Sequence, residues 1–190
     1  AALAEKYGDD RRTQIAGEAS DEMSEEDLVE NKPVLVSLTE RGYIKRTMQE
    51  KFRAQSRGGT GSKGQELREE DVVQHIFLAR TLDTILFFTD RGRVYSERCF
   101  QIPEGDRADR GMSIANIINI PPGERITAVL PVRDFGAAAF CTMVTRLGRI
   151  KRVALSEFES VRPSGLIATN LDDGDVLGWV RVTSGENEII

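Results

Sequence analysis

The chain has 190 residues, of which 39% are hydrophobic and 30% are charged, a composition typical of a soluble globular domain. No apolar run approaches the roughly 20 residues of a membrane-spanning helix, and the first residues lack the features of a signal peptide, so we expect no membrane partner. The net charge of −5 and the pI of about 5.1 argue against a uniformly basic nucleic-acid-binding domain.

The first 32 residues differ in composition from the rest. Residues 1–16 begin with good helix formers, and Gly8 with Asp9 and Asp10 predicts the end of a helix. Residues 17–32 form an acidic segment with few apolar side chains, for which we predict a mobile linker. Its carboxylates are those of Glu18, Asp21, Glu22, Glu25, Glu26, Asp27 and Glu30.

From Pro33 onward, short runs rich in Val, Ile, Phe and Thr alternate with Gly, Pro and Asp, which is typical of an all-β protein. The candidate strands are Val34–Thr39, Tyr43–Arg46, Val72–Ala79, Thr84–Thr89, Val94–Ser96, Ile126–Val132, Ala139–Thr145, Ile150–Val153 and Val176–Val182. Cys99 and Cys141 lie far apart in such stretches without partners at zinc-ligand spacing, so we expect buried, reduced thiols.

The strands fall into a repeat marked by Thr-x-x-Gly, in which Gly42, Gly92 and Gly148 are 50 and then 56 residues apart. Each copy places this tight turn between two strands, with the glycine supplying a positive φ. A period of about 50 residues made of strands predicts radial, propeller-like blades. A phenylalanine after each copy (Phe52, Phe100, Phe158) is interpreted as a core residue that ties each blade to its neighbour.

A second recurring strand begins at Asp71, Glu124 and Asp175 and predicts where the blades divide. The predicted blades are residues 33–71, 72–124 and 125–174, with a truncated fourth at 175–190.

Trp179 occupies an apolar position of the repeat and is expected in the core. Residues 172–175 are expected to form a turn rather than a calcium loop, and His75 to be an ordinary strand residue.

Basic residues recur with the repeat although the chain is acidic overall. Two interpretations are open: a rim that tracks a phosphate backbone, or strand-edge charges that block aggregation. The loop Gln55-Ser56-Arg57-Gly58-Gly59-Thr60-Gly61-Ser62-Lys63-Gly64 favours the first, because glycines let backbone N–H groups approach phosphate while Arg57 and Lys63 supply charge. It lacks the residue order of a Walker loop.

Residues 55–61 resemble the Gln-Arg-Arg-Gly-Gly-Lys-Gly box in the C-terminal domain of the DNA gyrase A protein, from the bacterial type IIA topoisomerases. Gln55, Arg57, Gly58, Gly59 and Gly61 match, whereas Ser56 and Thr60 replace two basic positions. The flanking segments Val34–Arg46, Ile85–Thr89 and Gly92–Tyr95 are also similar to that family, and residues 5–13 resemble the end of its helical core domain.

This resemblance implies a β-pinwheel of four-stranded blades that bends and wraps double-stranded DNA without sequence preference around its outer edge. It implies membership of an A2B2 complex with the gyrase B protein and the rest of the gyrase A protein, which uses ATP and Mg²⁺ to introduce negative supercoils on the bacterial chromosome in the cytoplasm. No cofactor is expected in this segment. The expected DNA-binding residues are Lys45, Arg46, Arg53, Gln55, Arg57, Gly58, Gly59, Gly61, Lys63, Arg91, Arg93, Arg110, Arg149, Lys151, Arg152 and Arg162.

Two alternatives remain: the matching domain of topoisomerase IV, which selects substrates, and a propeller-like protein-interaction module without a DNA role. The acidic pI favours the module, and the recurrent basic positions oppose it. The acidic linker either competes with DNA for the basic surface or only aids solubility. No catalytic residues are evident: Tyr7, Tyr43 and Tyr95 lack a nearby carboxylate cluster for magnesium, so the strand-cleaving tyrosine and the ATP site are expected elsewhere in the complex.

Overall fold

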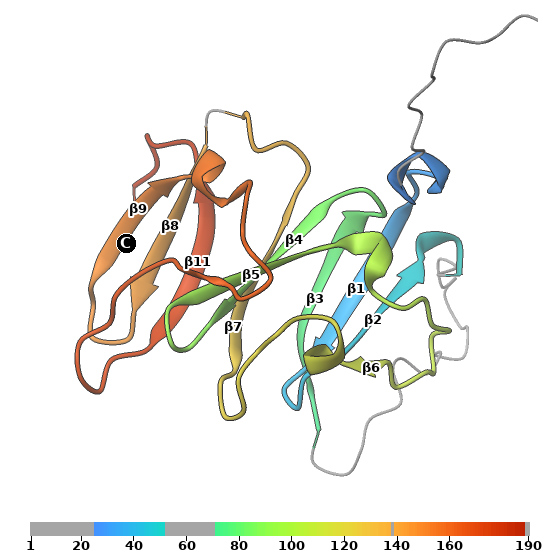
Figure 1. The fold of residues 1–190 in the computed structure, drawn as a ribbon, viewed down its shortest axis with the longest axis horizontal. Helices are drawn as coiled ribbons and strands as arrows, with labels where there is room; N and C mark the ends of the chain where they lie inside the picture. The colour runs from blue at the N-terminus through green and yellow to red at the C-terminus, as the bar shows by residue number, and fades with distance from the viewer. Residues whose placement is uncertain (1–24, 52–70, 138, 189–190) are drawn as a thin grey trace, which may run out of the picture.

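Three antiparallel sheets stand side by side in the computed structural model, which describes residues 25–51, 71–137 and 139–188 (Figure 1). The first sheet has the order β3-β1-β2-β6, with β1 at Pro33–Thr39, β2 at Tyr43–Met48, β3 at Val73–Arg80 and β6 at Met112–Ser113. The second has the order β10-β5-β4-β7, with β4 at Thr84–Thr89, β5 at Arg93–Arg98, β7 at Ile126–Val132 and β10 at Leu166–Ile167. The third has the order β11-β8-β9, with β8 at Phe140–Thr145, β9 at Ile150–Ala154 and β11 at Leu177–Thr183.

The remaining regular elements of the described residues are short 3₁₀ helices. They are η1 (Glu25–Leu28), η2 (Gln49–Lys51), η3 (Cys99–Gln101), η4 (Ile114–Asn116) and η5 (Leu155–Phe158). The expected helix end at residues 1–16 lies outside the described residues. The acidic segment was expected to be a mobile linker, but its described part includes η1, whose Glu26 contacts Arg98 of β5 and whose Glu25 contacts Gln101 of η3.

The all-β architecture is confirmed, but the predicted blade boundaries are wrong. The strand after each Thr-x-x-Gly hairpin pairs back onto the first strand of that hairpin, so β3 pairs with β1, β7 with β4 and β11 with β8. The strand at residues 177–183 therefore completes the third sheet and does not open a fourth. A repeat in a sequence gives the spacing of the units, whereas strand pairing decides where each unit begins.

Two strands of only two residues cross from one repeat to the preceding blade. In β6, Ser113 pairs with Tyr43 of β2, and in β10, Leu166 pairs with Val94 of β5. Each exchanged strand extends the outer edge of the neighbouring sheet and connects consecutive blades through backbone hydrogen bonds. Two residues are too few to show a strand pattern, so the sequence does not predict these strands.

The core consists of two layers, one on each side of the central sheet. Ile85 and Phe87 of β4 face the layer shared with the first blade, while Leu86 and Phe88 face the layer shared with the third. All four side chains are fully buried, because successive side chains of a strand point to opposite faces and both faces of β4 are covered. The apolar run at residues 85–88 therefore reflects a strand between two blades.

The third strands lie on the inner side of the assembly. In Figure 1 the first blade is on the right, the second in the middle and the third on the left. The inner strand β7 contacts both β3 and β11, so the inner strands of successive blades meet. The second strands β2, β5 and β9 lie on the opposite side of each central strand and form the outer side.

Some side chains expected in the core lie elsewhere. Trp179, on β11, is 57% exposed, so the described residues do not bury it. Phe158 is buried as expected, but Phe100 is only partly buried because the equivalent position, ten residues after the turn glycine, belongs to Ile102. Phe52 lies outside the described residues. The expected turn at residues 172–175 and the strand position of His75 are confirmed.

Both thiols are buried and free, as predicted. Burial raises the pKa of Cys99 and of Cys141 to about 12, so both stay protonated at neutral pH.

Candidate nucleic-acid interface

Each blade presents the same threonine-glycine turn. The hydroxyls of Thr39, Thr89 and Thr145 accept hydrogen bonds from the amide four residues later, at 3.1, 3.3 and 3.1 Å. The glycine amides donate to the carbonyls of these threonines, and the glycines have φ values of 80°, 74° and 87°. The threonine therefore closes the turn with its side chain, while the glycine supplies the positive φ that the sequence predicted.

A buried aspartate before the third strand secures the turn of the first blade and that of the third. The carboxylate of Asp71 accepts from the amides of Arg41 and Val72, and that of Asp175 from the amides of Leu147 and Val176. Removal from water raises the pKa of Asp175, but hydrogen bonds from the Thr145 hydroxyl and these two amides outweigh it and hold the pKa below its usual value. The aspartates at the start of the second recurring strand, Asp71 and Asp175, therefore support the turns.

Exposed arginines lie on or next to the outer strands. Arg91 is exposed at the β4–β5 turn, and Arg162 is exposed in the loop that leads to β10. Arg152 is exposed on β9 and stacks over the Phe140 ring at 4.6 Å. None of these three guanidinium groups has a carboxylate within 4.0 Å among the described residues, so each retains charge for an external anion.

Lys45 is not available to DNA, contrary to the sequence-based expectation. Its side chain is buried on β2, and Nζ donates to the carbonyls of Asp106, Arg107 and Asp109 at 2.8, 2.7 and 2.8 Å. An ammonium group has three protons, so all of its donors are used. Burial lowers the pKa of Lys45, partly offset by the charges of Asp109 and Asp106. The residue anchors a loop of the second repeat onto the first blade.

Further predicted cations also have partners within the chain, among them Arg152, whose Nη1 donates to the Gly185 carbonyl at 2.9 Å. Arg46 donates through Nε to the Ile102 carbonyl at 2.7 Å and pairs with Glu104 at 3.4 Å. Arg149 pairs with Asp172 at 2.6 Å, and Lys151 donates to the Ala168 carbonyl at 2.7 Å. The last two remain exposed, so their internal partners do not bury them.

The other predicted positions are partly described. Arg93 is half-buried on β5, and Arg110 is exposed with its guanidinium 5.6 Å from the centre of the Tyr43 ring. The glycine-rich loop lies outside the described residues, so the structure does not place Arg53, Gln55, Arg57, Gly58, Gly59, Gly61 and Lys63.

Comparison with known proteins matches the architecture blade by blade. A family model described as DNA gyrase C-terminal domain, beta-propeller, matches residues 34–80, 83–133 and 141–184. The first segment runs from β1 to β3, the second from β4 to β7 and the third from β8 to β11.

The chain belongs to the DNA gyrase C-terminal domain family. The DNA gyrase A protein of Mycobacterium leprae is 40% identical over 99% of this chain, and that of Clostridium acetobutylicum is 40% identical over 97%. The chain spans only 15% and 22% of these two relatives. Among known structures, the C-terminal domain of DNA topoisomerase IV has a TM-score of 0.68 at 31% identity, covering 84% of this chain and 48% of that one.

A DNA gyrase A C-terminal domain has the same fold, with a TM-score of 0.63 at 23% identity over 80% of this chain and 48% of that one.

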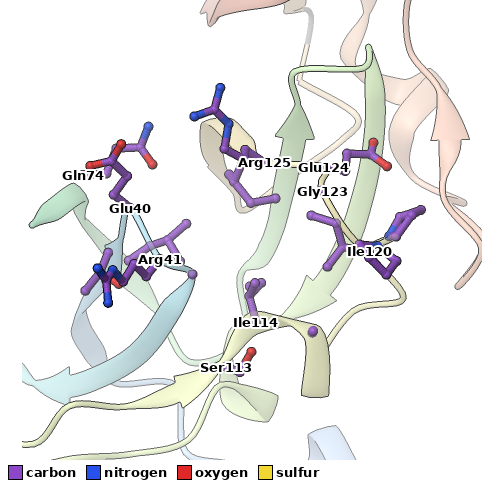
Figure 2. Close-up of a pocket in the computed structure, with 16 residues that line it drawn as sticks. Glu40, Arg41, Gln74, Ser113, Ile114, Ile120, Gly123, Glu124 and Arg125 are labelled. Atoms are coloured by element: carbon purple, nitrogen blue, oxygen red, sulfur yellow. The ribbon is translucent and has the colours of Figure 1, made fainter. Parts of the chain in front are cut away.

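This gyrase-family domain has a hollow at each junction between blades. One of about 390 Å³ lies between the β1–β2 turn and the loop before β7; Figure 2 shows Glu40 and Arg41 on one side and Glu124 and Arg125 on the other. Ile114 and Ile120 lie in its apolar part. A hollow of about 500 Å³ occupies the corresponding position between the second and third blades. Because the hollow recurs at both junctions, we interpret both hollows as a consequence of how the blades pack.

Within the described part of the gyrase-family domain, no cluster of three or more His, Cys, Asp or Glu residues could hold a metal ion. No helix there is long and apolar enough to span a membrane.

Proposed function

We propose that this chain binds double-stranded DNA through phosphates along its outer strands and bends it around the blades. We further propose that it serves a gyrase-type topoisomerase in the bacterial cytoplasm, together with the gyrase B protein and the rest of the gyrase A protein. In that complex ATP and Mg²⁺ would act elsewhere, and wrapping by this domain would direct negative supercoiling. Support comes from the family and from relatives that are DNA gyrase A proteins.

The observation that carries the proposal is the set of exposed, carboxylate-free arginines on the outer side. Arg91 lies in the turn before the outer strand β5, Arg162 lies in the loop that leads to β10, which pairs with β5, and Arg152 lies on β9. An acidic chain that keeps such cations in successive blades has a local surface suited to phosphate despite its net charge of −5. Contacts to phosphate carry no base information, so little sequence preference is expected.

Electrostatics must supply most of the binding energy. Bending 20–30 base pairs by 40–90° costs on the order of 1–6 kcal/mol, which several phosphate contacts have to offset. Each neutralised phosphate contributes about −0.9 to the slope of log affinity against log salt concentration. Salt dependence therefore measures how many contacts a variant loses.

The first prediction concerns the arginine before β5 and the arginine in the loop before β10. Replacing both Arg91 and Arg162 with Gln is expected to weaken duplex binding and to reduce the magnitude of the salt slope by about 1.8, because two phosphate contacts are lost. The matched control replaces Arg125 and Arg133, which flank the inner strand β7 and lie 3.9 and 3.7 Å from Asp90 and Asp83. This control also removes two positive charges, but from the inner side of the domain.

Binding is measured by fluorescence anisotropy, and bending by ligating short DNA into circles with the full chain bound. An equal loss of salt slope in both double variants would contradict an outer binding surface. If the wild-type chain leaves the linking number of the circles unchanged, the wrapping proposal is wrong.

A second candidate is a topoisomerase IV-type domain that selects substrates. The 31% identity and the TM-score of 0.68 to that C-terminal domain favour it. The same circles separate the two functions, because substrate selection requires DNA binding without a shift in linking number, whereas wrapping requires the shift.

A further inference from the structure

The acidic segment that precedes the first blade is attached to the outer strand of the second. Glu26 of η1 receives two hydrogen bonds from the guanidinium of Arg98, the last residue of β5: Nε donates to Oε1 at 2.7 Å, and Nη2 donates to Oε2. Beside it, the side-chain amide of Gln101 donates to Glu25 at 3.0 Å. A bidentate pair and a neighbouring hydrogen bond thus hold η1 on blade 2.

The guanidinium of Arg98 is held in place by its own blade. Its Nη1 donates to the Leu82 carbonyl at 3.1 Å and to the Thr84 hydroxyl at 3.0 Å. These contacts fix the plane of the group and leave Nε and Nη2 directed at the carboxylate. Nε and Nη2 together form a fork of two donors. This fork matches a carboxylate and a phosphate equally well, because both present two oxygens at the required spacing.

Arg98 also lies on the side of the domain where DNA is proposed to bind. It ends the outer strand β5, and the exchanged strand β10 pairs only with Arg93 and Val94 of that strand. The side chains of Arg98 and Glu26 are 36% and 43% exposed, so solvent and an external anion can reach the pair. A partly exposed pair is weak enough to be displaced.

We infer that the fork of Arg98 is an anion site that Glu26 occupies in competition with a DNA phosphate, so that the acidic segment limits DNA binding. This inference rests on the proposed function and adds a regulator to the same surface. When DNA displaces η1, Arg98 contributes one more phosphate contact. The competing group is covalently attached, so its effective concentration does not depend on that of the protein.

The second prediction tests this competition with variants of the full chain. Glu26→Gln frees the fork and is expected to tighten duplex binding at low salt. Its affinity should then fall roughly 3.5-fold more than that of the wild type between about 50 and 200 mM salt, the effect of one added phosphate contact. Glu30→Gln is the matched control, because Glu30 belongs to the same segment but pairs with Lys32 at 2.8 Å.

Arg98→Gln completes the test. In that background Glu26→Gln is expected to change the affinity no more than Glu30→Gln does. A Glu26→Gln variant that binds like Glu30→Gln, or one whose gain persists without Arg98, would overturn the competition while leaving the proposed function intact. A wild-type chain without salt-dependent DNA binding would overturn both. A purely structural role of the pair predicts lower stability of Glu26→Gln without tighter DNA binding.

Discussion

At the scale of the residue, the contrast between Lys45 and Lys151 shows what local sequence can predict. Both belong to an Ile-Lys-Arg triplet in the second strand of a blade, so both were expected to bind DNA. Lys45 is buried beneath a loop of the next repeat, more than 60 positions away, whereas Lys151 remains exposed. Residue type and spacing identify a cation on the outer strand, but a distant segment decides whether it meets solvent.

Lys45 is therefore expected to be important for stability. Lys45→Met would leave three carbonyls without their donor and lower the free energy of unfolding by about 3 kcal/mol. Lys51→Met is the control, because Lys51 pairs with Asp106 and Glu104 near the surface and should cost less than about 1 kcal/mol. Urea unfolding measures both, and equal losses would contradict the anchoring role of Lys45.

At the scale of the element, most of the strands could be predicted and the exchanged strands could not. Residues 84–89 and 126–132 were predicted with the bounds that the structure shows, because β-branched and aromatic runs end at clear turn residues. The short strands β6 and β10 owe their existence to the neighbouring blade, which offers the free edge of its outer strand. Only contacts between repeats create them.

The turn glycines allow the cost of a positive φ to be separated from the cost of a steric clash. Gly92 and Gly148 both have positive φ, so alanine at either position is strained by about 1 kcal/mol or more. A Cβ at Gly92 would lie 2.3 Å from the Thr169 carbonyl oxygen, whereas one at Gly148 would meet nothing within 4 Å. Chemical denaturation should therefore show a clearly larger loss for Gly92→Ala. Equal losses would mean that the segment at Thr169 moves aside without cost.

At the scale of the whole molecule, the repeat predicted separate blades, but the packing makes them interdependent. The central strand β4 contributes to both core layers, and the exchanged strands β6 and β10 join the first and second blades to the repeats that follow them. The sequence could not reveal this coupling, because it depends on which strand pairs with which. We therefore expect the three blades to unfold together.

The last prediction tests this coupling across the molecule. A Cβ at Gly111, just before β6, would lie 2.5 Å from the Ile44 carbonyl oxygen and should disturb the junction of the first two blades. The single tryptophan, Trp179, reports from β11 of the third blade. If the blades unfold together, Gly111→Ala lowers the urea midpoint equally by Trp179 fluorescence and by circular dichroism, with an unchanged slope.

Gly123→Ala is the control, because Gly123 also has positive φ but its Cβ would meet nothing within 4 Å. A fluorescence midpoint that stays at the wild-type value while the circular dichroism midpoint falls would show that the third blade unfolds independently. Regulation by the acidic segment depends on the junction that Gly111→Ala disturbs, since η1 precedes the first blade but is bound to the second. Only blades that keep a fixed arrangement hold Glu26 within reach of Arg98.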